Sequence, residues 1–132
     1  MSNGYHVVAD LDQAVYAALS EYLKEHREEA KAMLKSAALH CRSTLKATSP
    51  RGDGAKHYAD GWSYRDVSSA YTPAYVIYNR TKPGLGHLLN DGHVSANKYG
   101  TYGFVPGDRH IDKAAEDAAE YLIQQLKGAG AL

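Results

Sequence analysis

The stretch from residue 5 to residue 49 contains neither glycine nor proline, the two residues that most often end a helix. Apolar residues recur in it at helical spacing, as Leu11, Val15, Leu19, Tyr22 and Leu23 and then as Ala30, Met33, Leu34, Ala37, Cys41 and Leu45. An aspartate at position 10 or 12 can cap its start. Ser49-Pro50 ends it, because a proline disfavours helical geometry in the residue before it. We therefore predict a long helix over residues 10–48, after an N-terminal tail over residues 1–9.

The charged run Lys24–Glu29 interrupts the apolar pattern of this predicted helix. A helix of roughly 35 residues is longer than globular proteins usually contain. Either the helix breaks within the charged run, or its first part extends beyond the domain. An extended helix with an apolar stripe would pack against a partner, most simply another copy of the chain.

Two segments with strand character follow the flexible turn at Gly52 and Gly54. Residues 61–68 alternate in polarity, and residues 74–79, which Pro73 precedes, are rich in strand-forming residues. The short connection between them predicts an antiparallel hairpin.

The remainder of the chain is predicted to be a long loop and a final helix. In the loop, over residues 80–110, we expect a short helix at 85–90, an edge strand at 104–106, and little structure from 94 to 103. Asp108 or Asp112 begins the final helix, which covers residues 111–127 and ends at the glycines of the 128–132 tail.

This order of elements indicates an α+β fold. We expect the long N-terminal helix and the C-terminal helix to pack on one face of a small antiparallel β-sheet, which residues 49–110 supply together with the long loop. A length of 132 residues fits a single domain covering residues 1–132.

The charge balance and the single cysteine bear on function. Fifteen basic residues balance 15 acidic ones, whereas a protein that binds nucleic acid through phosphate contacts usually has a basic excess. Cys41 cannot form an intramolecular disulfide, and its place in the helical pattern predicts a small buried apolar residue.

Tyrosine dominates the aromatic residues, with 11 tyrosines against one phenylalanine and one tryptophan. Tyrosine is enriched at protein interfaces and also in half-exposed strands, and both interpretations remain open. No signal peptide and no membrane-spanning apolar stretch are visible, so we expect synthesis in the cytoplasm.

Seven histidines raise the question of a metal site. His87 and His93 lie six residues apart across a glycine, with His110 and Asp112 later in the chain, whereas zinc ligands usually come at shorter spacings. We favour histidines that form hydrogen bonds within loops. Neither a nucleophile elbow nor a phosphate-binding loop occurs, and we predict no catalytic residue, no metal and no cofactor.

The tripeptide Arg51-Gly52-Asp53 matches an adhesion motif, but it directly follows the predicted end of a helix. Matches of three residues arise often by chance. We interpret the tripeptide as a turn between helix and strand.

A set of short motifs, taken in order, is similar to the head–tail joining or putative tail-component proteins of long-tailed phages and prophages. The motifs are Ser49-Pro50, Asp53-Gly54, Tyr58, Gly61-Trp62, Tyr75-Val76-Ile77-Tyr78-Asn79, His87-Leu88-Leu89, Gly92-His93, Pro106, His110-Ile111 and Ala114-Ala115. They span roughly residues 10 to 127. The chain departs from the pattern at Asp53-Gly54-Ala55, where such proteins often have Asp-Thr-Gly, and after His93, where it is richer in tyrosine and glycine.

The resemblance implies a structural virion protein of the neck, made in the host cytoplasm, that completes the tail end and joins it to the head. Its partners would be other copies in a ring, head-completion proteins, and tail-tube or tail-terminator proteins. No membrane would be involved, and DNA would only pass through the channel.

Under the resemblance, one group of residues contacts neighbouring subunits or partners and another is structural. The contact group is Arg51, Asp53, His57, Tyr99 and Tyr102. The structural group is Pro50, Gly54, Trp62, Tyr75, Ile77, Asn79, His87, Gly92, His93 and His110.

Two alternatives stay open at this point. One is a small cytoplasmic enzyme with a metal held by His87, His93 and His110. The other is a regulatory binding module.

Overall fold

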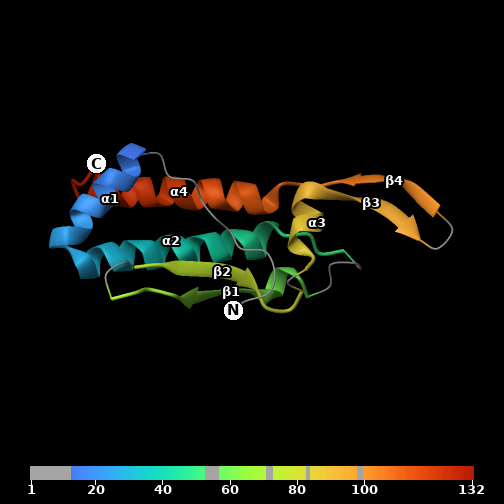
Figure 1. Cartoon of the computed structure of the whole chain (residues 1–132), viewed down its shortest axis with the longest axis horizontal. Helices are drawn as coiled ribbons and strands as arrows, with labels where there is room; N and C mark the ends of the chain where they lie inside the picture. The colour runs from blue at the N-terminus through green and yellow to red at the C-terminus, as the bar shows by residue number, and fades with distance from the viewer. Residues whose placement is uncertain (1–12, 53–56, 71–72, 83, 98–99) are drawn as a thin grey trace.

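A computed structural model describes residues 13–52, 57–70, 73–82, 84–97 and 100–132, with the backbone alone for Tyr16, residues 87–88 and residues 91–106. Its main elements are α1 (Gln13–Glu25), α2 (Arg27–Thr48), β1 (Trp62–Asp66), β2 (Tyr75–Asn79), α3 (Gly86–Asp91), β3 (Gly92–Asn97), β4 (Gly100–Pro106) and α4 (His110–Gly128). A 3-10 turn, η2 (Ala59–Gly61), precedes β1. Helices pack against a small antiparallel sheet, so the predicted α+β class is confirmed (Figure 1).

The helix predicted over residues 10–48 is two helices, because the chain breaks at His26; of the two alternatives for this segment, the break inside the charged run is confirmed. His26 leaves helical geometry at φ −133° and ψ 54°, and its ring stacks on Tyr22 at 4.6 Å between centroids. The break lets α1 turn back across α2 and α4, which buries Val15 with Leu122 and Leu126. A straight helix would leave Val15 in water. Residues 10–12 lie outside the described part of the chain.

The predicted hairpin is confirmed as the antiparallel pair β1 and β2. Trp62 lies opposite Asn79, and Tyr64 lies opposite Ile77. Since side chains alternate along a strand, these four belong to one face of the sheet, and α2 packs on that face. Arg42 of α2 lies over the Tyr64 ring at 5.2 Å.

The main core lies where α2, α4 and the sheet meet. Its larger buried members are Leu45, Tyr58, Trp62, Ile77 and Ile111. Buried alanines at positions 38, 114 and 118 lie between them, and their small side chains let α2 and α4 run side by side (Figure 1). Cys41 is buried in this cluster, which confirms its prediction as a small apolar core residue.

The long loop predicted over residues 80–110 is largely wrong, because it contains a second hairpin. β3 and β4 pair from Gly92 opposite Pro106 to Asn97 opposite Gly100, with a register shift between Ser95 and Ala96. Residues 93–97 do alternate between polar and apolar, but their small side chains and the glycines at positions 92, 100 and 103 give only a weak strand signal. The short helix expected at 85–90 and the edge strand expected at 104–106 are confirmed as α3 and the end of β4.

The β3–β4 hairpin extends away from the body of the molecule, beyond α3 and at the opposite end from α1 (Figure 1). We call residues 92–106 the arm. Across the described residues, no helix combines the length and apolar character needed to cross a membrane.

Candidate functional site

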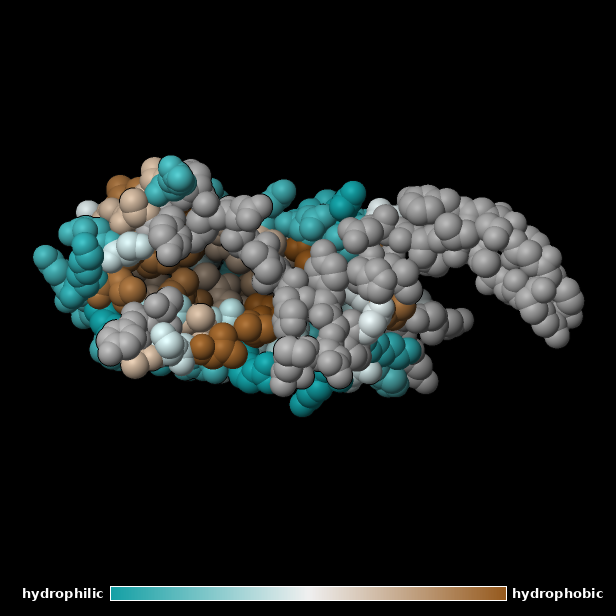
Figure 2. Space-filling model, viewed as in Figure 1, coloured by the Kyte–Doolittle hydropathy of each residue, from teal (hydrophilic) through white to brown (hydrophobic). Residues whose placement is uncertain are grey.

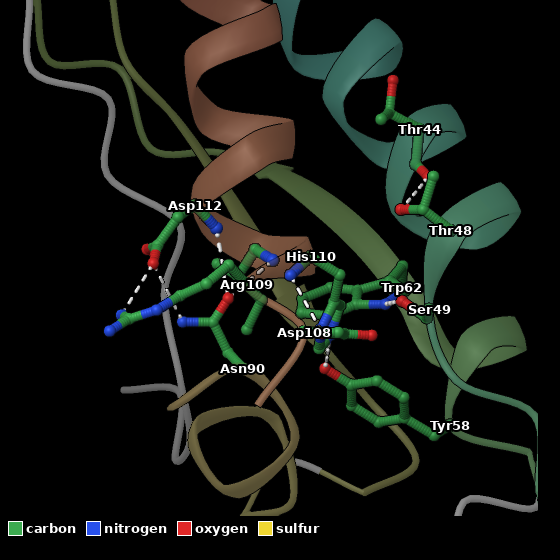
Figure 3. Close-up of polar contacts among 11 residues, drawn as sticks. Thr44, Thr48, Ser49, Tyr58, Trp62, Asn90, Asp108, Arg109, His110 and Asp112 are labelled. Atoms are coloured by element: carbon green, nitrogen blue, oxygen red, sulfur yellow. Dashed lines mark hydrogen bonds and ion pairs between the residues drawn. The ribbon is translucent and has the colours of Figure 1, made fainter. Parts of the chain in front are cut away.

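The start of α4 carries a chain of three polar side chains that links the helix to the turn before β1. The hydroxyl of Tyr58 lies 2.8 Å from Nε2 of His110, and Nδ1 of His110 lies 2.6 Å from a carboxylate oxygen of Asp108 (Figure 3). Tyr58 is 0% exposed and His110 is 2% exposed, whereas the Asp108 carboxylate reaches solvent. This series of hydrogen-bonded side chains therefore runs from the core to the surface.

The carboxylate fixes the tautomer of His110. An ionised carboxylate can only accept, so Nδ1 of His110 donates to Asp108, and in the neutral imidazole Nε2 then accepts from the Tyr58 hydroxyl. Both ring nitrogens are thus engaged in a residue that has almost no contact with water. Tyrosine, histidine and aspartate in this order can move protons in enzymes, and here the Tyr58 side chain is fully buried. Here the chain holds α4 to η2.

Asn90, at the end of α3, caps α4 across a gap in the sequence. Its Oδ1 accepts from the backbone N–H groups of Ile111 at 2.8 Å and Asp112 at 3.2 Å (Figure 3). The first N–H groups of a helix have no partner within the helix, and a cap normally comes from the residue just before it. That position holds Arg109, which has a left-handed backbone with φ 60° and makes no side-chain cap hydrogen bond. The fully buried Asn90 takes over this role.

Two further buried hydrogen bonds connect α2, the sheet and the turn between them. Nε1 of Trp62 donates to Oγ of Ser49 at 2.8 Å, at the end of α2. Nδ2 of Asn79 donates to the backbone oxygen of Tyr58 at 2.7 Å. Gly61 packs so closely beside Asn79 that a Cβ there would lie 2.0 Å from the Thr81 hydroxyl. We call these buried hydrogen bonds around the start of α4 the α4 junction. Among the described elements of the body, the junction connects all except α1.

A second histidine–carboxylate pair lies on the surface, where α2 meets α4. Nε2 of His40 lies 2.6 Å from Oδ2 of Asp117, and the ring of Tyr121 stacks on His40 at 4.5 Å. Both members of the pair are partly exposed. The pair links α2 to α4 at the surface, where such an exposed contact contributes little to the free energy of unfolding.

An open apolar groove of about 280 Å³ lies between α2, α4 and the beginning of β2, and it forms the brown hollow in Figure 2. Six alanines line it: Ala37 and Ala38 from α2, Ala74 before β2, and Ala115, Ala118 and Ala119 from α4. Larger side chains at these positions would fill the space. The groove is therefore a consequence of alanine on facing surfaces of the two helices.

Cys41 lines the groove with Ile77 and Leu122. Burial, assisted by the negative charge of Asp117, raises the pKa of the Cys41 thiol to about 11. Only the thiolate is a good nucleophile, so this thiol is unreactive near neutral pH. The groove offers apolar contact rather than covalent chemistry.

The arm differs from the groove in that its strands expose backbone groups. The described strands form two separate two-stranded sheets, so that each of the four has one edge without a partner among them. Such an edge presents N–H and C=O groups that can pair with a strand of another chain.

The residues predicted as partner contacts do not gather at one place. Arg51 is exposed, but its guanidinium donates to Asp60 at 3.3 Å and to the backbone oxygen of Lys46 at 2.9 Å, where it covers the end of α2. His57 is exposed and has a left-handed backbone with φ 67°. Asp53 and Tyr99 lie outside the described residues, and Tyr102 is described only as backbone within β4.

Some of the residues predicted as structural lie in or against the core, and for the others the structure describes the backbone alone or nothing. Trp62, Ile77, Asn79 and His110 are buried, Tyr75 packs on the core, and Pro50 is half-buried after α2. His87 lies in α3, and Gly92 and His93 in β3, as backbone alone. Gly54 lies outside the described residues.

The structure bears on the metal hypothesis through His110. Both of its ring nitrogens already have partners, so it could bind a metal only by losing one of them. Within the described residues, no three His, Cys, Asp or Glu side chains converge on a point where a metal ion could bind.

The sequence predicts neither the series of hydrogen bonds Tyr58–His110–Asp108 nor the capping of α4 by Asn90. Tyr58 and Asp108 carry no local signal for this role beyond a short motif and a helix start. Asn90 gave no local signal, because its partners are 21 and 22 residues away.

Comparison with known proteins adds no identification: no protein-family model, curated protein or solved structure matches this chain.

Proposed function

We propose that this chain is a structural subunit of a phage neck, which assembles with other copies into a ring that completes the tail end and joins it to the head. The observation that supports the proposal best is the projecting arm. An isolated two-stranded hairpin is marginally stable in water, so an arm extending from a compact body is most useful when it contacts another protein. The order of the motifs, which resembles the head–tail joining proteins, agrees with that use.

The body supports the same proposal. Its polar side chains at the α4 junction are satisfied within the fold, and its apolar core connects the two long helices to the sheet. A ring subunit needs such a body to hold its contact surfaces in fixed positions. A closed ring also needs two different surfaces on each copy, so that each copy contacts the next.

The remaining parts of the proposal concern partners and location. Head-completion proteins and tail-tube or tail-terminator proteins would contact the two ends of the ring. The neutral net charge suits a channel through which DNA passes without being held. The protein would be made in the host cytoplasm and end in the neck of the virion.

Light scattering of the purified protein over a broad concentration range, with negative-stain images of any large species, tests ring formation. Closed rings are expected, and their images give the number of subunits.

A genetic experiment tests the role itself. Deleting the gene from a phage or prophage that carries it should leave filled heads and separate tails, and supplying the intact chain from a plasmid should restore joined particles. Normal joined particles without this chain would overturn the proposal.

A further inference from the structure

We infer that the arm of one copy docks in the groove of the next copy, beside the free edge of β2. The inference rests on the proposed assembly of this chain with itself, and it names the two surfaces that meet.

The groove has the features of a site for an extended segment. It runs between α2 and α4 and is bounded by Ala74 and Tyr75, where β2 begins. β2 pairs with β1 on one side and with no described strand on the other. A strand laid there could form backbone hydrogen bonds with β2 while its side chains cover the apolar surface.

The arm has the complementary composition. Residues 92–106 contain one lysine and no acidic residue, together with valines, tyrosines and a phenylalanine. A nearly uncharged, aromatic-rich segment loses little on leaving water, and aromatic residues are the usual anchors in apolar pockets. β3 and β4 each have one edge that pairs with no other described strand and could pair with β2 of another copy.

The occupant we infer is the arm of another copy. The arm extends beyond α3, at the opposite end of the molecule from α1 (Figure 1), whereas the groove lies between α2, α4 and the beginning of β2. The base of the arm is also fastened to the body, because the backbone N–H groups of Asp108 and Arg109 donate to the carbonyls of Leu89 and Asn90 at 3.1 Å. These bonds hold the base of the arm at α3, away from the groove of its own chain.

A contact between arm and groove is heterologous, since two different surfaces meet. Every copy then offers one arm and one groove, and repetition of the contact gives a ring or a filament according to the angle between successive copies. A symmetric dimer would occupy both arms and both grooves only if the arm of each copy crossed to the groove of the other.

The single native cysteine makes a cross-linking test possible. In a Cys41→Ala background, Thr101→Cys marks the arm and Ala119→Cys marks the groove, and each variant carries one thiol. Mixed under oxidising conditions, the two variants should lose their monomer bands to a disulfide-linked heterodimer. A chain with both substitutions should form a ladder of higher species. Asn97→Cys places the thiol of the arm on β3 instead of β4 and should give the same cross-link.

Glu116→Cys is the matched control, since this residue is exposed on α4 and does not line the groove. Mixed with the arm variant under the same conditions, Glu116→Cys should show only monomer bands on a denaturing gel. Circular dichroism and unfolding curves identify any variant that has lost its fold, and Leu34→Cys then replaces Ala119→Cys in the groove.

The possible outcomes separate this inference from the proposed function. Rings or larger species that form without an arm-to-groove cross-link would overturn the inference and leave the ring proposal standing. A protein that stays monomeric at every concentration and shows no cross-link would overturn the inference, while the gene deletion would still decide the neck role.

Discussion

The α4 junction and the arm are held together in opposite ways. At the junction, buried side chains make specific hydrogen bonds between segments far apart in the sequence, as Tyr58 does with His110 and Asn90 with the first turn of α4. In the arm, two neighbouring strands pair through their backbones, and only α3 makes extensive contact with them among the described elements. The junction therefore fixes the elements of the body to one another, whereas the arm is tied to the body mainly at its base.

Asn90→Ala should have the largest effect on this comparison, because it removes the cap of α4. Two N–H groups would lose their acceptor inside the protein, and we expect the free energy of unfolding to fall by about 2 to 4 kcal/mol. Urea unfolding followed by circular dichroism measures it. Gln124→Ala is the control, since that exposed side chain donates to Glu120 one turn away on the same helix, and it should change stability by less than about 0.5 kcal/mol. Equal effects of the two variants would show that the cap contributes nothing.

Tyr58→Phe should have the next largest effect. The variant keeps the buried ring but leaves Nε2 of His110 without a donor, at a cost of about 1 to 3 kcal/mol in unfolding free energy. Tyr78→Phe, on a half-buried strand residue of the opposite sheet face, is the matched control. If both variants unfold at the wild-type urea concentration, the three-residue chain does not stabilise the junction.

Asp66→Asn should have a smaller effect that depends on pH. Hydrogen bonds from Ser68, with help from Lys31, lower the pKa of Asp66 from 3.8 to about 2. Because the pKa is lower in the folded state, the ionised carboxylate stabilises the fold fully above pH 3.8, and this stabilisation disappears as the pH falls through about 2.

Urea unfolding at several pH values tests this expectation. Wild type should be more stable than Asp66→Asn near neutral pH, and the two curves should converge as the pH falls below about 2, where Asp66 becomes protonated in the folded state as well. Ser68→Ala should shift the convergence to higher pH. A difference between wild type and Asp66→Asn that stays constant down to pH 2 would rule out the hydrogen-bonded carboxylate as its source.

Shortening the arm should have the smallest effect on stability and a complete effect on assembly. Replacing residues 95–102 with Asn-Gly leaves a three-residue loop between the paired Val94 and Phe104. We expect the monomer to unfold within about 0.5 kcal/mol of wild type, as for changes away from the core. Light scattering should then show no large species. A variant that still assembles, or that no longer folds, would contradict the division between junction and arm.

The sequence predicts those parts of the molecule whose signals are local. The apolar spacing identifies both α2 and α4, and the alternation and β-rich residues identify the β1–β2 hairpin. The sequence also locates the charged run in which the helix breaks. It does not decide between a break and an extended helix. That choice depends on Val15 finding Leu122 and Leu126, which are more than 100 residues away.

The parts that could not be predicted depend on contacts between distant segments. Asn90 becomes a cap only because α3 lies against the start of α4, and the groove exists only because alanines from two helices and a strand face each other. The arm escaped prediction although residues 93–97 alternate between polar and apolar, because the alternation is short and lies among small residues and glycines, which have low strand propensity.

The closure at the base of the arm has a consequence for how such a protein can diverge. The hydrogen bonds from Asp108 and Arg109 back to Leu89 and Asn90 bring the two ends of the 92–106 segment together before the segment itself begins. A loop whose ends are already fixed can gain residues at little thermodynamic cost, about 0.6 kcal/mol for each doubling of its length. Relatives of this protein could therefore lengthen, shorten or rewrite the segment to suit a new neighbour while inheriting the rest of the molecule unchanged.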